Sequence, residues 1–127
     1  MKQVSTLLGA AVLCLLVATP VLAQTRTYKV LATSRTGTMQ KEMQDAGDMG
    51  YRFVAVMGGE TAIGGKEVVV LMEKVEGDKN TYSYKLLATS RTGTLQKEIS
   101  EASANGYTLV ALAGRSEYVA ILERAVR

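Results

Sequence analysis

The seven-residue run ATSRTGT occurs twice in this 127-residue chain, at 32–38 and again at 88–94. Each copy places hydroxyl side chains, an arginine and a glycine directly before an amphipathic segment. Hydroxyls, a guanidinium and the free N–H groups at a helix N-terminus can together hold an anion. The candidate ligand-binding residues are Ser34, Arg35, Thr36, Gly37 and Thr38 in the first copy, and Ser90, Arg91, Thr92, Gly93 and Thr94 in the second.

Two other interpretations of this run stay open. It is also typical of a plain strand-to-helix turn in which Thr38 and Thr94 cap the helices, or of packing between the two copies. Neither the GxxxxGK[ST] nor the GxGxxG phosphate-binding pattern occurs in the sequence. The turn is therefore the simplest interpretation, and a small-anion site is the alternative.

Histidine is absent from the chain, which removes the commonest general base, the usual metal ligand and the near-neutral pH switch. Methionines at 39 and 43 suggest soft-metal ligation. Their counterparts in the second copy are Leu95 and Ile99, which keep the apolar character without the sulfur, so we expect core filling instead. The sequence therefore predicts no enzyme, no metal site and no cofactor.

The charge balance is nearly even, with 15 Lys and Arg against 12 Asp and Glu, a formal net charge of +3. No run of basic residues occurs, so we expect no nucleic-acid partner. Hydrophobic residues make up 47% and charged residues 21%, a balance typical of a globular chain.

The first 23 residues have the pattern of a secretory signal peptide: a basic Lys2, an apolar run over 7–19 and a small residue, Ala23, at the cleavage position. Thirteen apolar residues span about 20 Å of helix, less than the ~30 Å bilayer core, so we expect no stable membrane anchor after cleavage. The only cysteine, Cys14, follows a leucine where a lipoprotein signal needs a small residue. We expect an exported protein, periplasmic or secreted.

The chain beyond the signal peptide contains two copies of one unit. With an offset of 56, residues 28–55 share 18 identities in 28 positions with 84–111. The offset then becomes 50, because GGETAIGGK at 58–66 is longer than the matching turn at 114–116. That loop is either a binding loop or a tolerated insertion. We expect repeats at 24–75 and 84–127 joined by a linker at 76–83, sharing one core because each alone is too small.

Hydrophobic periodicity predicts a β-α-β-β order in each copy. The first strand, at 28–34, leads into the turn at 35–37. Residues Met39, Met43 and Ala46 then recur at helical spacing, with Gly50, and Gly106 in the second copy, placed to end the helix. Two strands complete the unit, at 51–57 and 67–74 in the first copy and at 107–113 and 117–124 in the second.

These strands are apolar without alternation, which indicates burial on both faces. One helix per unit covers one face, so the other face must meet the second copy or a second chain. We therefore predict an α+β fold of two small, mainly antiparallel sheets packed face to face, with the third strand central, the helices outside and a pseudo-twofold axis. A single six-stranded sheet that dimerises is the alternative.

The order Tyr-Lys, a helix carrying Lys-Glu, then Gly-Tyr-x-hydrophobic and a last strand closing in Glu-Lys or Glu-Arg resembles a small bacterial family, domain of unknown function 4177, present here twice. The resemblance implies a β-α-β-β domain without an established activity. Dodecins are similar in element order only, and no residue here matches their flavin site. We expect an exported, non-catalytic binding or structural module with a protein partner or self-association.

Overall fold

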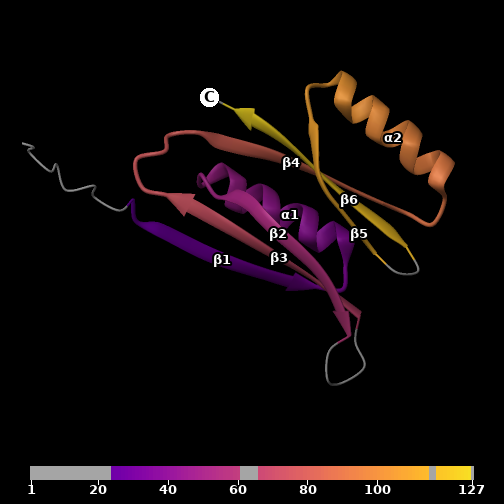
Figure 1. Ribbon diagram of the computed structural model, residues 1–127, viewed down its shortest axis with the longest axis horizontal. Helices are drawn as coiled ribbons and strands as arrows, with labels where there is room; N and C mark the ends of the chain where they lie inside the picture. The colour runs from indigo at the N-terminus through magenta and orange to yellow at the C-terminus, as the bar shows by residue number, and fades with distance from the viewer. Residues whose placement is uncertain (1–23, 61–65, 115–116, 127) are drawn as a thin grey trace, which may run out of the picture.

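The computed structural model describes residues 24–60, 66–114 and 117–126 (Figure 1). The predicted signal peptide at 1–23 and the centre of the loop at 58–66 lie outside the described residues. The protein is α+β with two similar halves, each in β-α-β-β order, as predicted. The first half is β1 (Arg26–Thr33), α1 (Thr36–Asp48), β2 (Arg52–Glu60) and β3 (Lys66–Val75). The second half is β4 (Thr81–Thr89), α2 (Thr92–Ala104), β5 (Thr108–Gly114) and β6 (Tyr118–Val126).

Each half forms its own three-stranded antiparallel sheet, in the order β1-β3-β2 (sheet A) and β4-β6-β5 (sheet B). The last strand is central in both, as its apolar sequence predicted. The registers agree: Tyr28 faces Glu73 in sheet A, and the matching Tyr84 faces Glu123 in sheet B. Both sheets also carry a register shift at the matching place, around Val54 in β2 and around Val110 in β5.

Both helices begin earlier than predicted. Arg35 and Arg91 are the N-cap residues, in extended conformation and without a side-chain cap, so the prediction that Thr38 and Thr94 cap the helices is wrong. The threonines at the ends of β1 and β4 make the turns instead, because the Arg35 N–H donates to Thr33 Oγ1 at 3.2 Å and the Arg91 N–H to the matching Thr89 hydroxyl at 3.1 Å.

The helix C-termini follow the sequence prediction. Gly50 has a φ of 90° and Gly106 a φ of 85°, the left-handed conformation that glycine adopts without strain. Behind Gly50, the Tyr51 N–H donates to the Ala46 carbonyl at 3.0 Å. Each glycine therefore turns the chain sharply from its helix into the next strand.

The main core is shared by the two halves. Met39, Met43 and Ala46 of α1 are fully buried, as their spacing predicted. They pack with Leu31, Val70 and Met72 of sheet A and with Tyr82, Tyr84 and Ile121 of sheet B. The expectation that both helices lie outside is therefore corrected for α1, which lies between sheet A and β4 (Figure 1).

The second helix lies on the outside, as predicted. Leu95 and Ala102 of α2 pack on the other face of sheet B, against Leu87, Ala120 and Leu122. Other elements therefore pack on both faces of sheet B, where α2 covers only part of the outer face, and on one face of sheet A. β4 begins at Thr81, inside the segment expected as a linker, so residues 76–80 connect the halves. None of the helices described here is long and apolar enough to cross a membrane.

Candidate functional site: the junction of the halves

Two glutamines of α1 bind the backbone edge of β4. Gln40 donates from Nε2 to the Tyr84 carbonyl at 2.6 Å, and its Oε1 accepts the Leu86 N–H at 2.6 Å. Gln44 accepts the Tyr84 N–H at 3.0 Å and donates to the Tyr82 carbonyl at 3.4 Å. Both side chains therefore satisfy the backbone groups that an edge strand leaves without a neighbour.

This close approach of helix and strand depends on Gly47. A Cβ at this position would overlap the carbonyl oxygen of Tyr82 and would press against the ring of Tyr84 at 3.0 Å. Glycine inside a helix costs roughly 0.5–1 kcal/mol relative to alanine. Here that cost is offset by contact across the junction.

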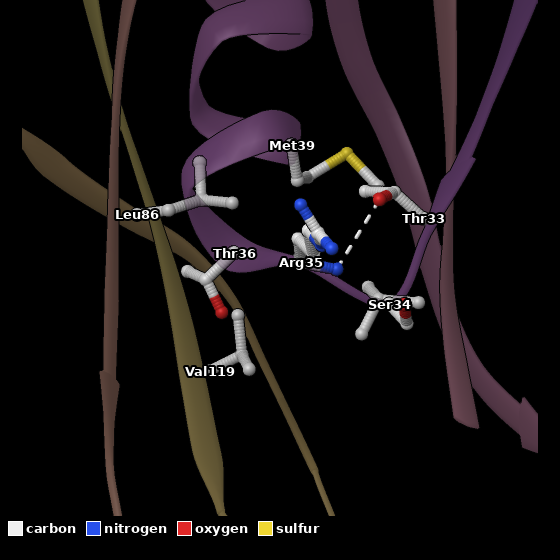
Figure 2. Close-up of a pocket in the computed structure, with 8 residues that line it drawn as sticks. Thr33, Ser34, Arg35, Thr36, Met39, Leu86 and Val119 are labelled. Carbon is white, nitrogen blue, oxygen red and sulfur yellow. Dashed lines mark hydrogen bonds between the residues drawn. The ribbon is translucent and has the colours of Figure 1, made fainter. Parts of the chain in front are cut away.

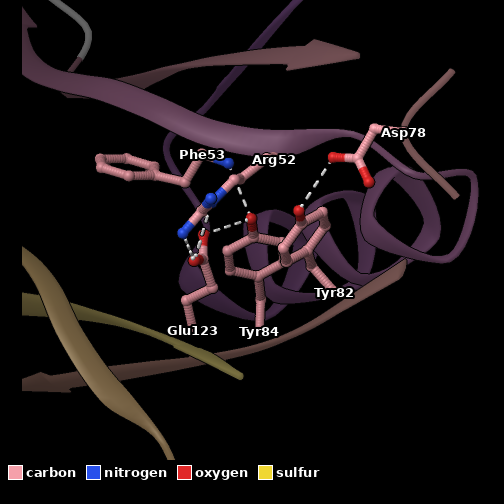
Figure 3. A network of polar contacts seen from close by, with 6 residues as sticks. All are labelled: Arg52, Phe53, Asp78, Tyr82, Tyr84 and Glu123. Atoms are coloured by element: carbon pink, nitrogen blue, oxygen red, sulfur yellow. Dashed lines mark hydrogen bonds and ion pairs between the residues drawn. The ribbon is translucent and has the colours of Figure 1, made fainter. Parts of the chain in front are cut away.

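A polar network lies across the same junction (Figure 3). The Tyr84 hydroxyl donates to Glu123 Oε2 at 2.8 Å and accepts the Phe53 N–H at 2.7 Å. Arg52 approaches the other carboxylate oxygen of Glu123, with Nε at 3.1 Å and Nη2 at 3.0 Å. Glu123 is 7% exposed, and the network satisfies both of its oxygens. It therefore joins β2 of the first half to β4 and β6 of the second.

The surroundings of the two buried tyrosines favour their neutral form. Burial is the main cause that raises the pKa of Tyr84 well above the usual range, and the neighbouring Glu123 raises it further. Burial also raises the pKa of Tyr82, whose hydroxyl donates to Asp78 Oδ2 at 3.2 Å. Both phenols therefore act as hydrogen-bond donors at physiological pH and do not supply charge.

The first ATSRTGT loop lies against the second half. Ser34, Arg35, Thr36 and Met39 line a pocket with Leu86 of β4 and Val119 of β6 (Figure 2). The cavity volume is about 20 Å³, which holds one water and is too small for an organic ligand. The contacts favour packing between the halves, one of the three interpretations of this loop.

The second loop has different surroundings, although its sequence is identical. Its five candidate residues, from Ser90 to Thr94, are all exposed, whereas Thr36 in the first loop is half-buried. The structure therefore places the ten candidate residues at the N-termini of two separate helices.

In the part of the chain that the structure describes, no three acidic or cysteine side chains gather as a metal site would require.

Apolar side chains are exposed on both sheets. The outer face of sheet A, defined by Tyr28, Val30, Val54 and Met57, is the face opposite the one that carries the buried Leu31, Val70 and Met72. Val30 there is 65% exposed and Tyr28 57%. On the second half, Leu109, Leu112 and Tyr118 form the open strip of sheet B, beside the area that α2 covers. Such patches mark interaction surfaces in soluble proteins.

The sequence motifs did not identify the residues of the junction. Gln40 is identical in both copies, but Gln44 and Gly47 of α1 correspond to Ser100 and Ser103 of α2. This divergence within an otherwise similar helix is the signal that could have identified α1 as the buried helix.

Comparisons of the chain with family models, curated proteins and solved structures find no match. The resemblance to domain of unknown function 4177 therefore stays a prediction.

Proposed function

We propose that this protein is an exported, non-catalytic binding or structural module whose partner is a protein or another copy of itself. The outer face of sheet A is the observation that carries the proposal. Four apolar side chains are exposed there on a three-stranded antiparallel sheet, while the matching face of sheet B is covered by the first half. A face of this kind gains free energy when a partner removes it from water.

The polar groups of the junction support a structural role. Glu123, Tyr84 and Arg52 bind one another across the junction, and Gln40 and Gln44 bind the edge of β4. Each of these groups is therefore used in holding the two halves together. This use leaves the exposed sheet face as the surface best suited to function.

The test is the native mass of the protein extracted without denaturant from the cells that produce it. We expect a particle larger than one chain. The double variant Val30→Asp and Val54→Asp should reduce the particle to a single chain, because it places two charges on the outer face. A wild-type particle with the mass of one chain would contradict the proposal.

The alternative function is binding of a small anion by the ATSRTGT loops. Its supporting observation is that the first-turn N–H groups of α1 and α2 receive no side-chain cap beside the exposed Arg35 and Arg91. Phosphate or sulfate should then raise the melting temperature above the effect of sodium chloride at equal ionic strength. Replacing both arginines by alanine should abolish that increment. An increment unchanged in the double variant would exclude the two loops as its source.

A further inference from the structure

The two exposed apolar surfaces match the two sides of the junction inside the chain. On this basis, and resting on the function proposed above, we infer that the protein associates head to tail with a second copy. The open strip of sheet B in one chain packs on the outer face of sheet A in the next. The contact then repeats the one that already joins the first half to the second.

The outer face of sheet A corresponds to a face that the junction covers. Tyr28 is 57% exposed, and the matching Tyr84 is 2% exposed because it lies against the first half. Val30 is matched by Leu86, which packs against the shared core. Val54, at the register shift of β2, is matched by the likewise packed Val110 at the same shift in β5. Matching apolar residues are thus packed against the junction in the second half and exposed in the first half.

For the open strip of sheet B the exposed residues lie in the second half, and their counterparts in the first half are packed at the junction. Residues Leu109, Leu112 and Tyr118 of the strip are exposed, with Leu112 at 54%. Their counterparts in the first half are Phe53, Val56 and Val68, all of which pack against the shared core. The second half therefore carries the same kind of apolar strip with which the first half forms the junction, and on the second half this strip is exposed.

The polar groups repeat as well. Gln96 matches Gln40 and is exposed on α2, where its Nε2 donates to Ser100 Oγ at 3.2 Å. β1 is an edge strand with the same register as β4. The backbone groups of Tyr28 and Val30 in a second copy are therefore placed to bind Gln96, as those of Tyr84 and Leu86 bind Gln40.

One carboxylate on the outer face of sheet A is already paired. Glu73 matches Glu123, and Arg26 of the adjacent strand pairs with it at 3.1 Å. Covering this face therefore leaves the Glu73 carboxylate with a partner, which is the condition for burying a charge at an interface.

One residue of α2 differs in a way that weakens the contact. Ser103 stands where Gly47 allows α1 to approach β4, so its Cβ holds α2 farther from a second copy. The contact between chains is therefore looser than the junction within the chain. It also joins two different surfaces, so assembly closes into a ring or continues as a filament.

The experiment uses three variants of the full chain as recovered from the producing cells, each analysed by sedimentation velocity over a range of concentrations. Val30→Asp disables the outer face of sheet A, and Leu112→Asp disables the open strip of sheet B. Val126→Asp adds the same charge at an exposed residue that belongs to neither surface. We expect wild type and Val126→Asp to self-associate, and each of the other two variants to be monomeric with an unchanged circular dichroism spectrum.

Mixing the two monomeric variants is the decisive measurement. Each retains one intact surface, so a head-to-tail contact predicts a one-to-one dimer that grows no further. In addition, Ser103→Gly should lower the concentration needed for wild-type assembly. The inference is overturned if Leu112→Asp still self-associates, which would indicate pairing of two identical faces, or if the mixture stays monomeric. It is equally overturned if the purified wild-type chain is monomeric while the extracted particle is large, and in that case the proposed function stands with a different partner.

Discussion

The hydroxyl of Tyr84 donates to the carboxylate of Glu123 at 2.8 Å, between residues that face each other on adjacent strands of sheet B. The same hydroxyl accepts the backbone N–H of Phe53, which comes from sheet A. One phenol therefore connects both sheets. Its counterpart in the first half, Tyr28, is exposed.

Tyr84 makes stability depend on pH in the alkaline range. Its pKa is raised in the folded protein, mainly by burial, so the unfolded chain loses the proton first. The contribution of this phenol to the free energy of unfolding is therefore fully present below about pH 10, the ordinary tyrosine pKa. As the pH rises beyond that value, the free energy of unfolding falls by up to about 1.4 kcal/mol per pH unit for one group. Urea unfolding between pH 8 and 11 should show this fall, and Tyr84→Phe should make it shallower.

Tyr84→Phe also has an effect at neutral pH. It leaves the Phe53 N–H without its acceptor, so we expect a loss of roughly 1–3 kcal/mol of unfolding free energy. Tyr28→Phe is the matched control, because that side chain is exposed and its loss of a hydroxyl should leave the unfolding free energy unchanged. A Tyr84→Phe variant with the wild-type alkaline profile would show that the burial of this phenol is not the cause.

Gln40 and Gln96 occupy matching positions in different surroundings. Gln40→Ala removes two hydrogen bonds to the edge of β4 and leaves the Tyr84 carbonyl and Leu86 N–H without those partners, so we expect a loss of roughly 1–3 kcal/mol. Gln96→Ala should change the stability of the single chain by less than about 0.5 kcal/mol, because its side chain is exposed. Equal losses in urea unfolding would contradict the assignment of α1 as the joining helix.

Gly47→Ala tests the close approach of α1 to β4. Alanine favours a helix, but its Cβ would overlap the Tyr82 carbonyl, so we expect a net loss of about 1–3 kcal/mol. Gly37→Ala lies in the same helix with nothing within 4 Å of the added Cβ and should be neutral or stabilising by up to about 1 kcal/mol. Thermal unfolding of both variants would reveal the difference, and a Gly47→Ala variant as stable as wild type would disprove the contact.

The shared core predicts one cooperative unfolding transition. Met39 and Met43 pack against side chains of both sheets, so separating the halves breaks the shared core and leaves the second half only the smaller cluster beneath α2. Fluorescence of the tyrosines and far-ultraviolet circular dichroism should follow the same urea curve, with an m-value suited to about 100 residues. Fragments 24–77 and 78–127 should both be unfolded. Two separate transitions would show instead that the halves are independent.

The sequence predicted the elements more accurately than their assembly. Helical spacing identified Met39, Met43 and Ala46 as buried, and Gly50 and Gly106 as helix ends, because these features depend on local geometry. The position of α1 depends on contacts across more than 40 residues, such as Gln40 to Tyr84, which periodicity does not report. The two similar copies suggested a symmetric pair, whereas α1 packs between the sheets and α2 lies on the outside.

The helix start was missed for a local reason. Each ATSRTGT run holds three threonines that can accept a backbone N–H, and the last one in the first copy, Thr38, precedes the apolar residues directly. The structure uses the threonine at the end of β1, because Arg35 stays extended and Thr33 accepts its N–H. Sequence periodicity did not separate these two arrangements.

The glutamines of α1 have a consequence for aggregation. Fibrils grow when an incoming strand pairs with a free sheet edge. At Tyr82, Tyr84 and Leu86 the backbone groups of β4 are already bound by side-chain amides, so a foreign strand must first displace the helix. Cross-β growth of sheet B is therefore disfavoured from this edge in the native state and becomes possible there only after α1 detaches.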